Sequence, residues 1–121
     1  MQGIDGNKRK SFSDTSLTLV KSFLGNNTII RQGYFPDSIV MEDMENKYAF
    51  VSLDCDLYNP TLAGLKFFYP RLSADGMIFC HDYSSGNWEG VKKAVDMFCE
   101  ENNINIILLP DIGGTAIIVK A

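Results

Sequence analysis

Four side chains that can bind a metal ion follow two apolar segments of this sequence. Asp54 and Asp56 come directly after one apolar run, and His81 and Asp82 come directly after the next comparable run. Runs of this kind are typical of buried parallel strands, and in open α/β sheets ligands bind beyond the carboxyl ends of such strands. We therefore expect the four side chains to converge at one edge of a sheet and to form a divalent-cation site.

The residue types at this site suit a defined chemistry. Carboxylate oxygens suit magnesium, whereas a histidine among the ligands would suit manganese, iron or zinc better. A cation that binds a hydroxyl oxygen and a carboxylate that removes its proton would together favour attack by that oxygen. The alternative is structural, because Asp54 and Asp56 could simply end a strand and cap the helix that follows.

The hydrophobic periodicity of the chain alternates between strand and helix. Helices are expected at residues 14–24, 38–46, 60–72 and 91–101, and strands at 28–33, 48–53, 77–80, 103–109 and 115–120. The last two strands are joined by a link too short for a parallel crossover, so they must be antiparallel. The expected fold is an α/β domain with a mostly parallel sheet of about five strands that ends in an antiparallel hairpin.

Length and composition limit the class of protein. The chain has 121 residues, of which 45% are hydrophobic, and this predicts a flexible lead over residues 1–12 and a single domain over 13–121. A net charge of −4 argues against nucleic acid as a partner. No apolar run has the length of a membrane span. The three cysteines show no metal-ligand spacing, which predicts reduced core residues in a cytoplasmic protein.

Several separated motifs give the sequence a family resemblance. They are Phe50-Val-Ser-Leu-Asp-Cys-Asp-Leu-Tyr-Asn-Pro-Thr61, Phe68-Tyr-Pro-Arg-Leu72, Gly76-Met-Ile-Phe-Cys-His-Asp-Tyr83 and Gly90-Val-Lys-Lys-Ala-Val-Asp96, with Phe12-Ser-Asp-Thr-Ser-Leu17 and Gly33-Tyr-Phe-Pro-Asp37 before them. In order and spacing they resemble the macrocin O-methyltransferase family. The resemblance implies a Rossmann-like enzyme that uses S-adenosylmethionine and a magnesium ion to methylate a hydroxyl, typically on a sugar of an antibiotic natural product.

The resemblance also implies roles for the residues that follow the two apolar runs. Asp54 and Asp82 correspond to metal-ligating aspartates, and Asp56 corresponds to a residue proposed as the general base. His81 stands where characterised members often carry another aspartate. The imidazole is a candidate ligand in its own right, of a kind that suits metals other than magnesium.

Three aromatic residues near the expected site are candidates for contact with substrate. Tyr58 and Tyr83 could line a pocket, although a tyrosine at a strand end is at least as often part of the packing. Trp88 follows a glycine-containing loop, and it could close over the site, stack on a sugar ring, or pack as an ordinary loop aromatic.

Most of a cofactor site of the family is missing from the sequence. A complete member begins its sheet with a strand that leads into a Gly-rich loop, and a second strand ends in an acid that holds the ribose. Of the cofactor region, this sequence keeps only the loop of Gly33, Tyr34 and Phe35, which in such folds lies near the adenine. The sequence therefore resembles the carboxyl-terminal half of such an enzyme.

Two functions follow as expectations. In the first, the chain is an O-methyltransferase, or a fragment of one, that acts on a small-molecule hydroxyl acceptor. In the second, it is a non-catalytic metal-binding or interaction module. Because the cofactor site is incomplete, we expect the isolated chain to lack activity. We also expect it to associate with itself or with a chain that supplies the missing half, since half a sheet leaves an unpaired apolar edge.

Overall fold

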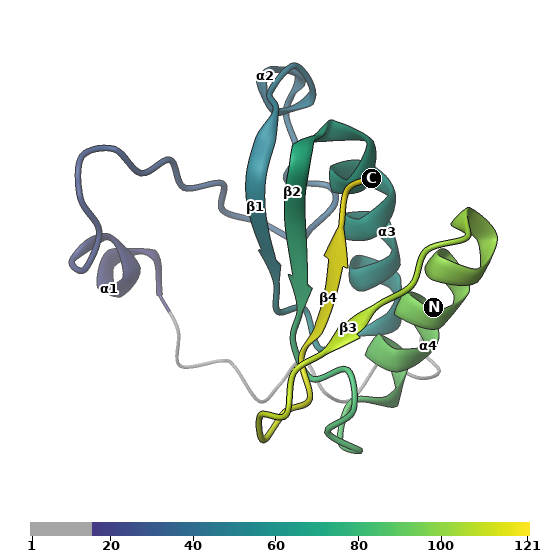
Figure 1. The fold of residues 1–121 in the computed structure, drawn as a ribbon. Coiled ribbons are helices and arrows are strands. Elements are labelled where there is room, and N and C mark those ends of the chain that lie inside the picture. Colours follow the sequence, from purple (N-terminus) through teal and green to yellow (C-terminus); the bar gives the residue numbers. More distant parts are fainter. Residues whose placement is uncertain (1–15) are drawn as a thin grey trace.

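The computed structural model describes residues 16–121, which form one mixed sheet with helices on one of its faces (Figure 1). The expected flexible lead lies outside the described residues. The strands are β1 (Tyr48–Leu53), β2 (Leu72–Cys80), β3 (Ile107–Leu108) and β4 (Ala116–Val119), in the order β1-β2-β4-β3. The helices are α1 (Leu17–Lys21), α2 (Met41–Met44), α3 (Tyr58–Phe68) and α4 (Glu89–Asn102), and a 3-10 turn, η2 (Tyr69–Arg71), follows α3.

The observed sheet differs from the expected one in the number and the direction of its strands. β1 pairs in parallel with β2, but β4 runs antiparallel to both β2 and β3, so two of the three neighbouring pairs are antiparallel. Residues 28–33, expected as a fifth strand, are coil. Just after them, the ring of Phe35 stacks on Phe68 of α3 with centroids 6.2 Å apart, so this part of the chain packs against α3.

The expected carboxyl-terminal hairpin is present. Ile107 of β3 lies opposite Ile117 of β4 in an antiparallel pair, as the short link between the two strands requires. β2 begins at Leu72 rather than at the expected residue 77, because Asp75 and Gly76 lie inside the strand as a local irregularity. Asp75 has a left-handed backbone, and a Cβ on Gly76 would lie 2.9 Å from the carbonyl oxygen of Ser73.

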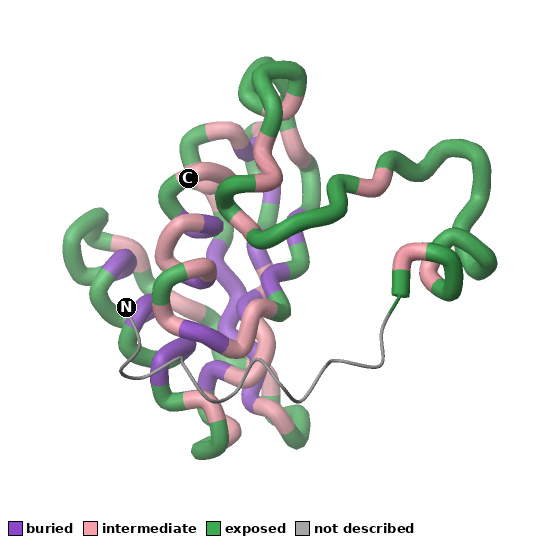
Figure 2. The backbone as a smooth tube through the Cα atoms, turned by 180° about the vertical axis from the view of Figure 1, so that it is seen from behind, coloured by how far each residue is buried: buried purple, intermediate pink, exposed green. Residues whose placement is uncertain are grey.

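The core lies between the sheet and the two long helices. α3 and α4 both cover the face that points away from the viewer in Figure 1, and the buried residues gather between these layers (Figure 2). α3 approaches the sheet closely at Gly64, where a Cβ would lie 2.8 Å from a methyl group of Leu53. The largest fully buried apolar side chains are Leu65 of α3, Ile78 of β2, Val91 and Val95 of α4, and Ile118 of β4.

The helices differ from expectation mainly where they lack a surface to pack on. α3 begins at Tyr58, two residues before the expected start, and Leu57 stands at its N-cap position. α1 is a short helix capped by Ser16, and none of its residues is buried. The helix expected over residues 14–24 does not extend beyond Lys21. Helices gain most of their stability from packing an apolar face, and no residue of α1 is buried. Among the described residues, no helix has the length and apolar character required to cross a bilayer.

Burial in the core predicts how much the free energy of unfolding falls when a core side chain is truncated. Ile78→Ala should lower the free energy of unfolding by about 2–5 kcal/mol, because Ile78 is fully buried between the sheet and the helices. Ile112→Ala, which removes the same atoms from a fully exposed position, should change it by less than about 0.5 kcal/mol. Urea denaturation followed by circular dichroism measures both, and equal losses in the two variants would contradict the assigned core.

Candidate metal centre

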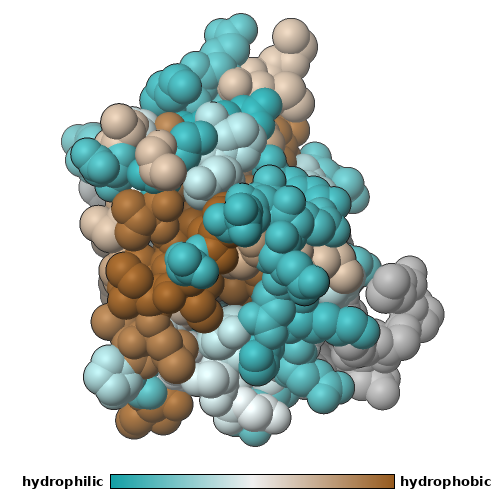
Figure 3. Space-filling model, turned by 45° about the vertical axis from the view of Figure 1, so that its right-hand side comes forward, coloured by the Kyte–Doolittle hydropathy of each residue, from teal (hydrophilic) through white to brown (hydrophobic). Residues whose placement is uncertain are grey.

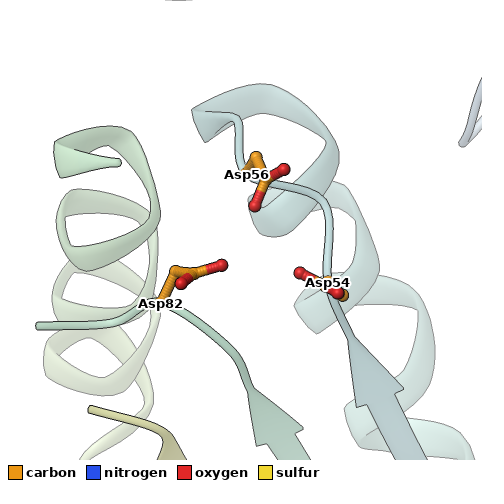
Figure 4. A group of neighbouring side chains, drawn as sticks. All are labelled: Asp54, Asp56 and Asp82. Carbon is orange, nitrogen blue, oxygen red and sulfur yellow. The ribbon is translucent and has the colours of Figure 1, made fainter. Parts of the chain in front are cut away.

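Three carboxylates meet just beyond the carboxyl ends of β1 and β2. One ligand oxygen each from Asp54, Asp56 and Asp82 lies within 4.8 Å of the others, and the side chains border a common space (Figure 4). The parallel pairing brings them together, because its last pair joins the ends of β1 and β2. The His81 N–H then donates to the carbonyl oxygen of Leu53 at 3.0 Å, which extends the pairing to the point where the acids begin.

Two of the three acids have an unusual backbone. Asp56 and Asp82 both have φ of 62°, in the left-handed region that most side chains avoid. Aspartate tolerates this region better than most residues, because its short polar side chain can bond locally. Each left-handed residue turns the chain sharply away from its strand, and this directs the two carboxylates toward the shared space. Backbone strain of this kind is often found at functional sites.

The turn between β3 and β4 supports the turn that carries Asp82. A Cβ on Gly113 would lie 3.2 Å from Asp82 Oδ1, so this turn lies directly against the Asp82 side chain. Ser84 N–H donates to the carbonyl oxygen of Gly114 at 3.2 Å. The two glycines in sequence, Gly113 and Gly114, were a signal for a close contact at this turn. The sequence did not show that β4 pairs antiparallel with β2, which is what brings the turn to Asp82.

Tyr83 anchors the same turn to α4. Its hydroxyl donates to Asp96 Oδ1 at 2.5 Å, and Lys92 Nζ donates to Asp96 Oδ2 at 2.8 Å. The Tyr83 side chain is buried, and burial together with the bond to Asp96 raises the pKa of its hydroxyl. The phenol therefore stays neutral and holds the turn in place. Sequence reasoning missed Asp96 and Lys92, because their role depends on how α4 packs.

His81 and Cys55 lie beside the acids without joining their group. His81 Nε2 forms a 2.7 Å hydrogen bond with Ser52 Oγ, and the imidazole is not among the ligand atoms that meet within 4.8 Å. Burial, with added repulsion from Asp54 and Asp56, raises the pKa of the Cys55 thiol to about 11. The thiol is thus protonated at neutral pH. The donors that the structure brings within 4.8 Å of one another are the three carboxylates.

The other two aromatic candidates take part in helix packing. The Tyr58 hydroxyl donates to the sulfur of Met97 at 3.3 Å, and a Cβ on Gly90 would lie 3.0 Å from the Tyr58 backbone nitrogen. Trp88 precedes α4 and packs, half-buried, against the core. These contacts join the starts of α3 and α4 near the acids. Contact of Tyr58, Tyr83 or Trp88 with a substrate stays a prediction.

The loop expected to contact the cofactor lies at the other end of β1. Gly33 and Phe35 line a cavity of about 420 Å³ together with Tyr48, the first residue of β1, and Phe68. Tyr34 is exposed beside them. The acids follow the last residue of this strand, and six residues of strand span roughly 20 Å. The structure therefore does not bring this loop together with the acids.

In open α/β sheets ligands bind beyond the carboxyl ends of the strands, which is where the three acids of this sheet lie. The sequence matches the macrocin-O-methyltransferase (TylF) family over residues 12–120, and the chain belongs to that family. The family is one of S-adenosylmethionine-dependent methyltransferases, which implies that cofactor.

Solved methyltransferases have a similar fold. The O-methyltransferase NovP matches with a TM-score of 0.52 and 22% identity over 63% of this chain and 31% of its own. The apo structure of CalS11, a TDP-rhamnose 3′-O-methyltransferase of calicheamicin biosynthesis, matches with a TM-score of 0.51 and 25% identity over 60% and 31%. A second CalS11 structure gives a TM-score of 0.54 and 24% identity over 64% and 30%. The matched part thus spans about a third of these enzymes. No curated protein matches the chain.

The turn that supports Asp82 predicts a pH dependence. Thr115 donates to Asp111 from its hydroxyl at 2.7 Å and from its backbone N–H at 2.8 Å, and these bonds lower the pKa of Asp111 below its ordinary 3.8. This stabilisation is present above pH 3.8 and is lost as the pH falls through the lower folded-state pKa. Between pH 6 and pH 3 the wild type should therefore lose more stability than Asp111→Asn in urea denaturation, and parallel losses would contradict the assignment.

Proposed function

We propose that this chain forms the acidic part of a metal-dependent O-methyltransferase site that acts on a hydroxyl of a sugar or another natural product. The convergence of oxygens from Asp54, Asp56 and Asp82 within 4.8 Å carries this proposal. Asp54 and Asp82 hold a divalent cation, and Asp56 acts as general base. Family membership supports the methyl transfer, and the similarity to CalS11, which methylates TDP-rhamnose, supports a sugar hydroxyl as the acceptor.

The donor set fits a hard cation. Magnesium and calcium bind oxygen at about 2.0–2.6 Å, so two oxygens on opposite sides of one ion lie up to roughly 5 Å apart. The observed limit of 4.8 Å is within that range. Asp54 is exposed and the other two acids are half-buried, which leaves room for water or substrate. A bound cation would supply positive charge that lowers the pKa of a substrate hydroxyl and offsets the mutual repulsion of the acids.

The residues then serve one substitution reaction. S-adenosylmethionine would supply the methyl group for this reaction. As the substrate oxygen attacks, the Asp56 carboxylate takes the hydroxyl proton and later returns it to water. The turns at Asp56 and Asp82 are held by packing, and this fixed geometry favours the attack.

A second function, a metal-binding or interaction module without catalysis, also has an observation in its favour. The Gly33–Phe35 loop lies at the far end of β1 from the acids, and the described residues contain no Gly-rich turn directly after a parallel strand. In this form the chain would bind a cation through Asp54 and Asp82 but would not bind the methyl donor by itself.

The metal site predicts cation-dependent stability. Saturating Mn²⁺ or Mg²⁺ should raise the melting temperature of the wild type by several degrees, because a ligand that binds only the folded state stabilises it. Asp54→Asn and Asp82→Asn should each lose most of this rise. His81→Gln should keep it, since the imidazole is held by Ser52. Differential scanning fluorimetry with and without EDTA measures these shifts.

Asp75→Asn provides a matched control. Asp75 has φ of 64°, nearly the backbone conformation of Asp82, but it lies outside the acidic group. Asparagine accepts this backbone as well as aspartate does, so the control separates loss of a ligand from backbone strain. If Asp75→Asn and Asp82→Asn respond to the cation identically, Asp82 is not a ligand.

The position of the Gly33–Phe35 loop predicts weak cofactor binding by the isolated chain. Calorimetric titration with S-adenosylmethionine should give a dissociation constant weaker than about 100 µM, with or without Mg²⁺, because backbone donors for the methionine part are lacking near the acids. A dissociation constant of a few micromolar would show that the described residues already contain a complete cofactor site.

A further inference from the structure

Two parts of the chain hold the turn that carries Asp82. Among residues 16–121, helices pack on one face of the sheet only, and the other face presents apolar side chains over neighbouring strands (Figure 3). On the helix side, the Tyr83 hydroxyl donates a hydrogen bond to Asp96 of α4. At the end of the sheet, Ser84 N–H donates to the carbonyl oxygen of Gly114 at 3.2 Å. The first contact reaches a helix that the core holds in place, because six residues of α4 are buried.

The contact between this turn and α4 involves three side chains. The Tyr83 hydroxyl oxygen lies 2.5 Å from Asp96 Oδ1, and Lys92 Nζ lies 2.8 Å from Asp96 Oδ2 and 3.3 Å from the Tyr83 hydroxyl oxygen. Lys92 Nζ also lies 4.8 Å from the centre of the Tyr83 ring. We call Tyr83, Lys92 and Asp96 the α4 anchor. Tyr83 is buried, whereas the Lys92 and Asp96 side chains are about half exposed.

The bond between Tyr83 and Asp96 is the stronger element of the α4 anchor. An ion pair between exposed lysine and aspartate side chains contributes little to stability, because water and salt screen it. A hydrogen bond from a phenol to a carboxylate is charge-assisted and is among the stronger kinds in proteins. Since the core holds α4, this bond fixes the residue that follows Asp82 relative to the helix.

Asp82 needs such support for two reasons. Its φ is 62°, in the left-handed region that most side chains avoid. Its carboxylate lies within 4.8 Å of those of Asp54 and Asp56, and like charges repel one another. Without a contact at the next residue, both effects favour a turn in which Asp82 has moved away from the other two acids.

We propose that Asp96 and Lys92 are positioning residues of the metal centre, which hold Asp82 through Tyr83 at the place that a small octahedral cation requires. Because it takes Asp82 as a ligand, this role rests on the proposed function. Mg²⁺ demands near-ideal octahedral geometry with oxygens at about 2.0–2.1 Å, whereas Ca²⁺ accepts about six to eight oxygens in flexible geometry. Binding of Mg²⁺ and Mn²⁺ therefore depends on the α4 anchor more strongly than binding of Ca²⁺ does.

Metal affinities of anchor variants test this role. Electron paramagnetic resonance of free Mn²⁺ gives the dissociation constant for Mn²⁺, and competition gives those for Mg²⁺ and Ca²⁺. Tyr83→Phe keeps the buried ring and removes the hydroxyl, so it should weaken Mg²⁺ and Mn²⁺ binding about tenfold and Ca²⁺ binding less than about threefold. Asp96→Ala should have the same effect. Asp96→Asn, which keeps an oxygen that accepts from the Tyr83 hydroxyl, should restore most of the affinity.

Tyr48→Phe is the matched control. It also removes the hydroxyl of a partly buried tyrosine, which donates to the carbonyl oxygen of Asp43 at 2.9 Å, but it lies at the other end of β1 from the acids. All three affinities should stay as in the wild type. Hydrogen exchange without metal reports on the α4 anchor separately, since amides of residues 82–85 should exchange faster in Tyr83→Phe but not in Tyr48→Phe.

Each contrary result has a distinct pattern. A wild type that binds no Mn²⁺ overturns the proposed metal site, and the positioning role with it. If the wild type binds Mn²⁺ and both Tyr83→Phe and Asp96→Ala bind all three ions equally well, the metal site stands and the positioning role is wrong. Unchanged exchange at residues 82–85 in Tyr83→Phe contradicts that role too. So does an equal loss of Mg²⁺ and Ca²⁺ binding, or an equal effect of Tyr48→Phe, because the α4 anchor would then act only on overall stability.

Discussion

The parallel pairing of β1 with β2 is the interaction on which the acidic site depends. The two strands end together, with Leu53 opposite Cys80, and the acids begin at the next residues of each strand. A shift of register by one residue would reverse the faces of β2 and separate Asp82 from Asp54 and Asp56. Burial opposes such a shift, because the side chains of Ile78 and Cys80 are fully buried in the core. The packing of the core thus fixes the position of residues that themselves make little contact with it.

Beyond the strands, the site is held by contacts from parts of the chain that lie far apart in sequence. Asp56 and Asp82 both adopt a left-handed backbone, and three carboxylates in close proximity repel one another. The structure maintains this arrangement because Tyr83 is bonded to Asp96 on α4 and because the turn at Gly113 lies directly against Asp82. The two faces of the sheet are covered unequally. Its strands are apolar on both faces, but the described helices cover only one of them.

Local patterns were sufficient to predict much of the fold. β1, the two long helices and the antiparallel hairpin follow from hydrophobic periodicity and from the length of one link, properties that neighbouring residues determine together. The fifth strand at residues 28–33 could not be excluded in this way. A β-strand needs a partner, and residues 28–33 pair with no strand of the described sheet, while Phe35 just after them packs on Phe68 of α3. The mostly parallel sheet was wrong because β4 lies between β2 and β3 and runs antiparallel to both, which leaves β1 and β2 as the one parallel pair of the described sheet.

For the site, the sequence by itself determined which acids follow which strands, and hence that Asp54, Asp56 and Asp82 would be close in space. Only the tertiary structure decided the orientation of each side chain. His81 directly follows β2, as a ligand at the end of that strand would. Its imidazole is hydrogen-bonded to Ser52 on the neighbouring strand β1. Strand ends are specified by local sequence, whereas side-chain direction depends on backbone dihedrals and on partners from distant segments. These partners come together only when the sheet and its helices have packed.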